Sequence, residues 1–175
     1  MKAVLLSIQP KWCELIASGK KTVEVRKTRP KLATPFKVYI YCTKDEPLYR
    51  SGDKFWCPND DCGNGKVIGE FVCDRIQEIT YTQIYNFGRY KDVCEAETRL
   101  DFYALDDYLK QKNGYGWHIS DLVIYDKPRE LSEFFHACDK PNGTDCSVCV
   151  DRRENKCKSI KRAPQSWCYV EEVNR

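Results

Sequence analysis

Apolar and polar residues alternate with a period of two along several segments of the chain. The alternation is strictest over 22–27, where Val23 and Val25 share one face and Glu24 and Arg26 share the other. Such a pattern predicts a half-buried β-strand, because successive side chains of a strand point to opposite faces. Similar apolar or alternating runs predict further strands over 3–8, 36–43, 66–79, 119–125 and 166–173.

Helical spacing of apolar residues follows the first predicted strand. Pro10 suits the first turn of a helix, Trp12 and Ile16 recur four residues apart, and Gly19 provides a C-terminal cap. Trp12 is therefore expected in the core. The same reasoning predicts a helix over 101–111 and a helical turn over 131–136.

These elements amount to about six strands and two or three helices, with no sustained strand–helix–strand alternation. This order favours an α+β fold with a mostly antiparallel, closed or nearly closed sheet over a parallel one. Residues 44–65 lose all periodicity and contain several Gly and Pro, so we interpret them as a loop insertion. Residues 137–163 form a second, cysteine-rich insertion. We expect one domain over 1–175.

Composition is that of a globular protein and excludes a disordered one. The chain has 175 residues, of which 42% are hydrophobic and 31% charged. No run approaches the ~20 apolar residues that a membrane helix needs. The apolar start is too short for a secretory signal and lacks a cleavage site. We therefore expect a cytoplasmic protein without membrane contact.

Charge is concentrated in two segments although the net charge is only +3. Residues 20–31 carry six basic side chains against one acidic, and residues 151–162 carry six against two. Segregation of this kind is typical of a surface that binds a nucleic-acid backbone. The alternative is that both segments are ordinary solvated loops.

Three opposite charges are predicted to converge at the second strand. Glu24 and Arg26 lie two residues apart on one face, about 6.5–7 Å along the strand, and Lys21 stands at its entrance after the Gly19 turn. Beside a barrel mouth they would form a pocket that holds a phosphate and accepts from a base or ribose. The alternative is a surface ion pair worth about 0–1 kcal/mol.

Residues 19–26 read Gly-Lys-Lys-Thr-Val-Glu-Val-Arg. This segment resembles the G-x-K-x-x-E-x-R signature of ASCH domains, which belong to the PUA-like superfamily of RNA-binding barrels. Segments 7–10, 116–120 and 164–170 are also similar to that family. The resemblance covers roughly 1–43, 66–128 and 164–173. It implies a PUA-like β-barrel that binds RNA or a modified nucleotide in a cleft lined by the motif.

Aromatic and basic residues near the motif complete the expected ligand site. Trp117 is expected beside His118 in a Gly-flanked turn, where a Trp ring can stack on an unpaired base for about 1–3 kcal/mol. His118 can donate or accept at a base edge. Trp167 is a further stacking candidate, although Trp and His are more often structural. The candidate ligand-binding residues are Lys21, Glu24, Arg26, Arg29, Trp117 and His118.

The resemblance also allows a hydrolase. Some small ASCH proteins are amidohydrolases of an acylated cytidine, and others are nucleases. In the amidohydrolase pattern a threonine stands where this chain has Glu24, whereas Thr22 lies in the neighbouring register. A desolvated Lys21 would then act as base, with Glu24 orienting water. No Ser-His-Asp or Cys-His arrangement is assembled from the sequence.

A cysteine pattern in the second insertion predicts a structural zinc site. Its spacing is C-x7-C-x2-C-x7-C, and four thiolates make a closed tetrahedral site that orders a core-poor loop. The alternatives are unrelated free cysteines, or a zinc loop that docks a protein partner. The predicted ligands are Cys138, Cys146, Cys149 and Cys157, with Cys57, Cys62 and His136 as supplementary candidates.

Overall fold

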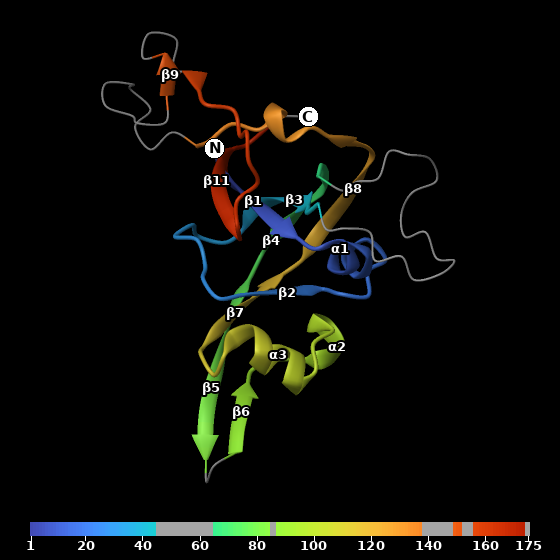
Figure 1. Ribbon diagram of the computed structural model, residues 1–175, viewed down its shortest axis with the longest axis vertical. Coiled ribbons are helices and arrows are strands. Elements are labelled where there is room, and N and C mark those ends of the chain that lie inside the picture. Colours follow the sequence, from blue (N-terminus) through green and yellow to red (C-terminus); the bar gives the residue numbers. More distant parts are fainter. Residues whose placement is uncertain (45–64, 85–86, 138–148, 152–155, 174–175) are drawn as a thin grey trace. The chain divides into compact units, whose positions relative to one another are not determined.

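The computed structural model describes residues 1–44, 65–84, 87–137, 149–151 and 156–173, and they form an α+β fold (Figure 1). The strands are β1 (Lys2–Ile8), β2 (Val23–Arg26), β3 (Phe36–Cys42), β4 (Val67–Cys73), β5 (Ile76–Ile84), β6 (Phe87–Lys91), β7 (Gly114–His118), β8 (Ser120–Arg129), β9 (Cys149–Asp151), β10 (Lys156–Cys157) and β11 (Trp167–Glu171). The helices are α1 (Pro10–Ala17), α2 (Glu95–Thr98), α3 (Phe102–Leu109) and the 3-10 turn η1 (Leu131–Glu133). None of the helices in these ranges is long and apolar enough to span a membrane.

The elements with the clearest periodicity are confirmed. Strands β1, β2 and β3 fall within one residue of the alternating segments, and α1 begins at Pro10. Gly19 follows this helix with a φ of +70°, the left-handed conformation that glycine adopts without steric cost. Helix α3 begins after Asp101, whose carboxylate accepts from the Ala104 amide at 2.8 Å.

Three parts of the prediction are wrong. The long strand expected over 66–79 is two strands, β4 and β5, separated by Asp74 and Arg75. The helix α2 and the strand β6 were not predicted. Strand β7 replaces the expected turn around Trp117. Its Gly116 lies where a side chain would meet Val23 at 2.9 Å, so glycine serves here to let β7 approach β2 closely.

The described strands form separate sheets, and no closed barrel is found among them. One sheet has the order β11-β1-β3-β4-β8, a second has β2-β7-β5-β6, and β9 pairs with β10. Strand β1 runs antiparallel to β11 but parallel to β3. A parallel pair needs a long crossover connection, and the segment containing α1 provides it. All pairs of the second sheet are antiparallel.

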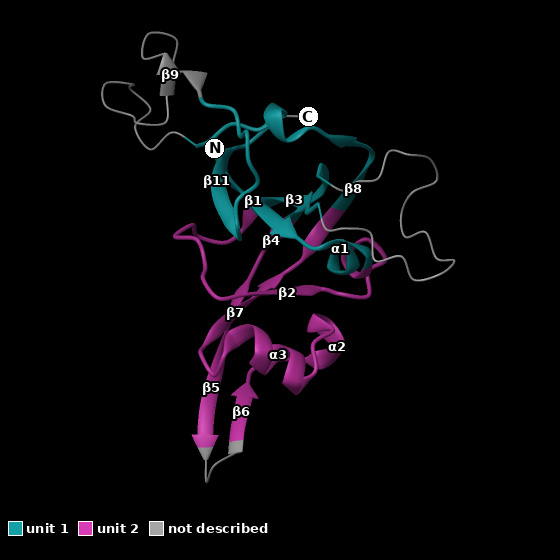
Figure 2. Ribbon diagram, viewed as in Figure 1, with its two compact units in different colours: residues 1–14, 37–71, 123–175 teal, residues 15–36, 72–122 magenta. Residues whose placement is uncertain are grey.

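The described residues group into two compact units, each assembled from segments far apart in the sequence (Figure 2). The first unit comprises residues 1–14, 37–71 and 123–175 and contains most of the five-stranded sheet. Its core cluster joins β1, β3 and β11 to the segment after η1, through Leu5, Tyr39 and Phe134. The Tyr39 and Phe134 rings meet edge to face, with centroids 4.9 Å apart.

The second unit comprises residues 15–36 and 72–122 and contains the candidate site. Its sheet β2-β7-β5-β6 packs one face against α3. The core cluster on this face is Val25, Ile79, Tyr90, Leu105 and Leu109. Glu24 and Arg26 alternate with Val23 and Val25 along β2, as the sequence predicted, and the Arg26 side chain also hydrogen-bonds Tyr108 of α3.

Candidate functional site

A turn after α1 positions the start of the motif. The Gly19 amide donates to the Ile16 carbonyl at 2.9 Å, and the Lys21 amide donates to the Leu15 carbonyl at 2.8 Å. The chain then enters β2, which pairs with β7 so that Glu24 lies opposite Trp117 and Arg26 opposite Tyr115. The register therefore sets the motif charges beside two aromatic residues of β7.

The three motif charges converge, as the sequence predicted. Lys21 Nζ lies 3.4 Å from Glu24 Oε2, and Arg26 Nη2 lies 3.0 Å from Glu24 Oε1. The carboxylate thus bridges an ammonium and a guanidinium. We refer to Lys21, Glu24 and Arg26 as the charge triad.

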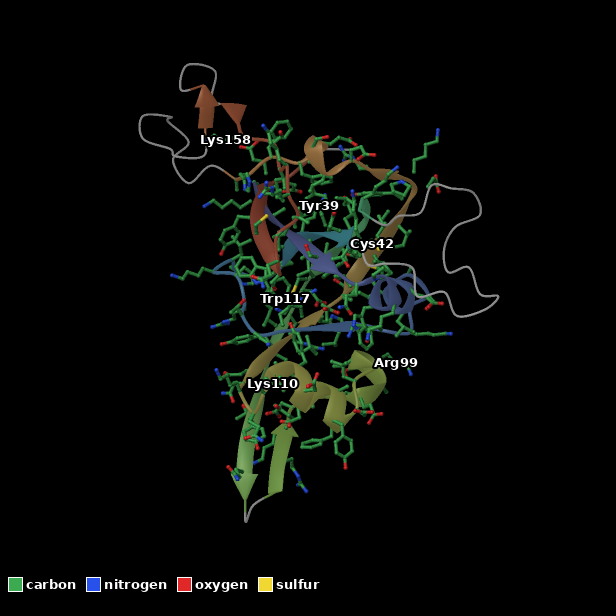
Figure 3. The ribbon with its side chains drawn as sticks, in the orientation of Figure 1. Tyr39, Cys42, Arg99, Lys110, Trp117 and Lys158 are labelled. Atoms are coloured by element: carbon green, nitrogen blue, oxygen red, sulfur yellow. The ribbon has the colours of Figure 1, made fainter. Side chains whose placement is uncertain are left out.

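Helix α2 supplies a fourth group that the sequence did not indicate. Lys21 Nζ donates to the Thr98 carbonyl at 2.5 Å, at the C-terminal end of α2 where helix carbonyls favour a cation. The Thr22 amide donates to the Glu97 carbonyl at 3.0 Å. Arg99 Nε donates to the Lys20 carbonyl at 2.5 Å, and Figure 3 labels Arg99 beside α2. Helix α2 therefore holds the entrance of β2 at three consecutive residues.

Burial of the triad corrects the expectation of an open pocket wall. The side chains of Lys21, Glu24 and Arg26 are only 1%, 7% and 10% exposed. Burial lowers the pKa of Lys21, although the Glu24 carboxylate opposes this by favouring the charged ammonium. Removing three charges from water is costly even when they are paired. The triad accordingly lies beneath the surface in this structure.

Exposed cations follow the triad directly and are held by tyrosines. Lys27 Nζ lies 5.0 Å from the centre of the Tyr108 ring, and the Arg29 guanidinium lies 5.6 Å from that of Tyr115. Lys27, Arg29 and Lys31 are all exposed. A cation over an aromatic face gains about 0.5–1 kcal/mol at exposed sites, which restricts its side chain. We refer to residues 27–31 as the basic segment.

The structure places the two β7 candidates differently from expectation. Trp117, labelled in Figure 3, is fully buried and packs edge-on against Phe36, with ring centroids 5.9 Å apart, so its ring is covered in this structure. His118 remains partly exposed, but its Nδ1 lies 2.6 Å from Asp74 Oδ1. Trp12, expected in the core, is half-buried beneath Lys11. Trp167 is half-buried against Tyr169.

The residues that sequence reasoning missed are Thr98, Tyr108, Tyr115 and Asp74. Thr98 is 77 positions from Lys21, so no local pattern connects them. Tyr115 had a usable signal, because it alternates with Trp117 and therefore shares its strand face. Asp74 lies between β4 and β5, where a single long strand was expected. Recognising this break would have identified Asp74 as a loop carboxylate.

The predicted zinc site lies mainly outside the described residues. Cys138, Cys146, Cys57 and Cys62 are not described, and in the described ranges no three acidic, His or Cys side chains are placed to hold a metal. The backbone of β9 and β10 does set Cys149 opposite Cys157 in antiparallel register. The zinc site remains a proposal. The zinc content of the purified protein tests it, and less than half an equivalent of zinc would exclude it.

Comparisons with known proteins agree with this architecture. The ASCH domain family model matches residues 6–129, whereas no curated protein matches the sequence. The crystal structure of ASCH from Zymomonas mobilis has a TM-score of 0.57 at 18% identity, covering 97% of this chain and 88% of that one. A point mutant of it has a TM-score of 0.58 at 18% identity, covering 98% and 92%. This likeness establishes a shared fold, and the family match over most of the chain shows that the protein belongs to the ASCH domain family, whose members are in general associated with nucleic acids.

Proposed function

We propose that this ASCH domain binds single-stranded RNA through the basic segment, while the buried charge triad holds β2 in place. The supporting observation is the pair of exposed cations, Lys27 and Arg29, each seated over a tyrosine ring directly after the triad. Guanidinium and ammonium groups are the donors that proteins use for phosphate. The Arg29 plane also offers a surface on which an unstacked base can lie.

Preorganisation is what the tyrosines contribute. A long basic side chain normally loses about 0.5–1.5 kcal/mol of entropy when a ligand immobilises it. Stacking on Tyr108 and Tyr115 restricts Lys27 and Arg29 before any ligand arrives. The ion pair of Arg26 with Glu24 lies within β2, the strand from which the basic segment departs, and β2 is paired with β7 along its length.

A second buried carboxylate shows what distinguishes this site. In the first unit, Glu70 is 5% exposed, accepts from Tyr125 Oη at 2.5 Å and lies 3.5 Å from Lys37 Nζ. Lys37 also pairs with Glu172 at 3.4 Å, so negative charge exceeds positive there. No basic run continues from that cluster as residues 27–31 continue from the triad. Phosphate recognition therefore suits the basic segment that follows the triad and not the Glu70 cluster.

The same donors would accept the phosphate of a free or modified nucleotide. A polynucleotide contacts several cations at once, however, and each contact releases counterions and adds affinity. The basic segment offers three exposed cations within five residues. This spacing favours RNA over a mononucleotide as the ligand.

The proposal predicts salt-dependent RNA binding that depends on Arg29. We expect Arg29→Ala to weaken the binding of a fluorescent single-stranded RNA roughly five- to tenfold and to reduce the salt slope by about 0.7, the value of one single-strand phosphate contact. Fluorescence anisotropy at several salt concentrations measures both. Lys110→Ala is the matched control, because Lys110 is exposed at the C-terminal end of α3 (labelled in Figure 3) and already paired with Asp107. Absence of RNA binding by the wild-type protein at low salt would refute the proposal.

Hydrolysis of an acylated nucleoside is the second candidate, favoured by the lowered pKa of Lys21. A lysine that gives up its proton more readily than usual, placed beside Glu24, would have the chemistry of a general base. The 1% exposure of the Lys21 side chain argues against direct substrate contact in this conformation. Turnover across a panel of acylated nucleosides, abolished by Lys21→Ala, is the result this candidate requires.

A further inference from the structure

The strand face that carries Glu24 and Arg26 continues beyond β7. Arg26 lies opposite Tyr115, which in turn lies opposite Glu78 of β5. Because side chains alternate along a strand, Thr80 and Thr82 share the face of Glu78. Their partners on β6 are Lys91 and Arg89, respectively. We use the term ribbon face for these two threonines and their two basic partners: Thr80, Thr82, Arg89 and Lys91.

Exposure rises from Trp117 on β7 to the charged residues of β5 and β6. Trp117 is fully buried, Tyr115 is half-buried, and Glu78, Lys91 and Arg89 are exposed. Thr80 and Thr82 are half-buried between them. At a rise of about 3.3 Å per residue, the distance from Glu78 to Thr82 is about 13 Å along β5. The face therefore emerges into solvent next to Tyr115 and extends along the β5–β6 pair, which Figure 1 shows as two adjoining arrows.

Charge distinguishes the two sides of this sheet. The ribbon face carries two cations, and its carboxylate neighbour Glu78 accepts from Asn113 Nδ2 at 3.3 Å. The opposite side is covered by α3, whose flank bears Asp101, Asp106 and Asp107 against Lys110 and the Lys27 ammonium over Tyr108. A polyanion is therefore attracted more strongly to the ribbon face than to the carboxylates of α3. This asymmetry favours a nucleic-acid partner for the ribbon face.

We propose that the ribbon face is a second phosphate-contacting surface, continuous with Arg29 and Tyr115, so that the domain binds a run of several nucleotides. This inference rests on the RNA binding proposed above. Arg89 and Lys91 provide the charged donors, and the hydroxyls of Thr80 and Thr82 provide neutral ones between them. The Arg29–Tyr115 pair lies at one end of this track and the two ribbon cations at the other, with Glu78 between them.

Oligonucleotide length separates this surface from the basic segment. Binding of single-stranded RNAs of about four and about twelve nucleotides is measured by anisotropy, since sites for single strands span roughly 4–16 nucleotides. The test variant is the double substitution Arg89→Gln and Lys91→Gln. The control is Lys110→Ala with Lys127→Ala, which removes the same charge from exposed positions off the ribbon face. Circular dichroism and melting temperature verify that each variant folds.

We expect the ribbon variant to bind the longer RNA roughly tenfold more weakly, with a salt slope reduced by about 1.4, twice the 0.7 of one contact. Its affinity for the shorter RNA should stay within about twofold of wild type, because an RNA of that length occupies only the basic segment. Wild-type affinity and slope of the ribbon variant for the longer RNA would overturn the inference while leaving RNA binding intact. Failure of the wild-type protein to bind either RNA would instead overturn the proposed function, and the inference with it.

Discussion

Replacing Glu24 by alanine is expected to lower the free energy of unfolding by about 3–5 kcal/mol. The carboxylate is the only acidic member of the charge triad, and it lies 3.4 Å from Lys21 Nζ and 3.0 Å from Arg26 Nη2. Its removal leaves two like charges buried side by side, each 10% exposed or less. Breaking a buried pair from one side costs far more than the pair contributes to stability, because the remaining charge keeps its desolvation penalty. Urea unfolding at neutral pH measures the loss.

Two further variants identify the cause of this loss. Glu78→Ala removes a carboxylate from an exposed position on the same sheet face and should change the free energy of unfolding by no more than about 0.5 kcal/mol. Glu24→Met combined with Lys21→Met and Arg26→Met removes all three charges of the triad, so it should recover much of the stability that Glu24→Ala loses. A Glu24→Ala protein within about 1 kcal/mol of wild type would show that the triad is solvated in solution.

The strand that bears the site was predictable because its signals are local. The alternation over 22–27 and the conformational preference of Gly19 depend on neighbours within a few residues. The convergence of Lys21, Glu24 and Arg26 followed from the same alternation. Whether those charges face water did not follow, because alternation assigns a residue to a face without saying what covers that face.

Long-range contacts account for what was missed. The carbonyl that holds Lys21 belongs to Thr98, and the ring under Arg29 belongs to Tyr115, both distant in sequence. Trp117 was expected in a turn because of its flanking glycine, whereas it lies in strand β7. In the structure, Gly114 of the same strand lies where a side chain would meet Leu109 at 2.8 Å, so this glycine reflects close packing and not a turn. A closed barrel was expected from the same strand count, which does not determine how sheets join.

Trp117 gives the second large expected effect, because the structure makes it a core residue instead of a ligand contact. Its side chain is fully buried, lies opposite Glu24 and Ile76 in the strand register, and packs against Phe36. Trp117→Ala is expected to lower the free energy of unfolding by about 3–5 kcal/mol, through lost burial and the cavity left behind. Urea unfolding measures this cost.

The Trp117 prediction also separates packing from base stacking. Trp117→Phe keeps an aromatic ring of smaller volume, so it should be destabilised less than Trp117→Ala and should bind RNA with an affinity within about twofold of wild type. Trp12→Ala is the matched tryptophan control, since Trp12 is half-buried and its truncation should be correspondingly milder. If Trp117→Ala unfolds like the wild-type protein but loses RNA affinity, the ring is a stacking surface and its burial here does not describe the bound state. Because Glu24 and Trp117 face each other across β2 and β7, their two substitutions should be non-additive, which a double-mutant cycle on the unfolding free energy would detect.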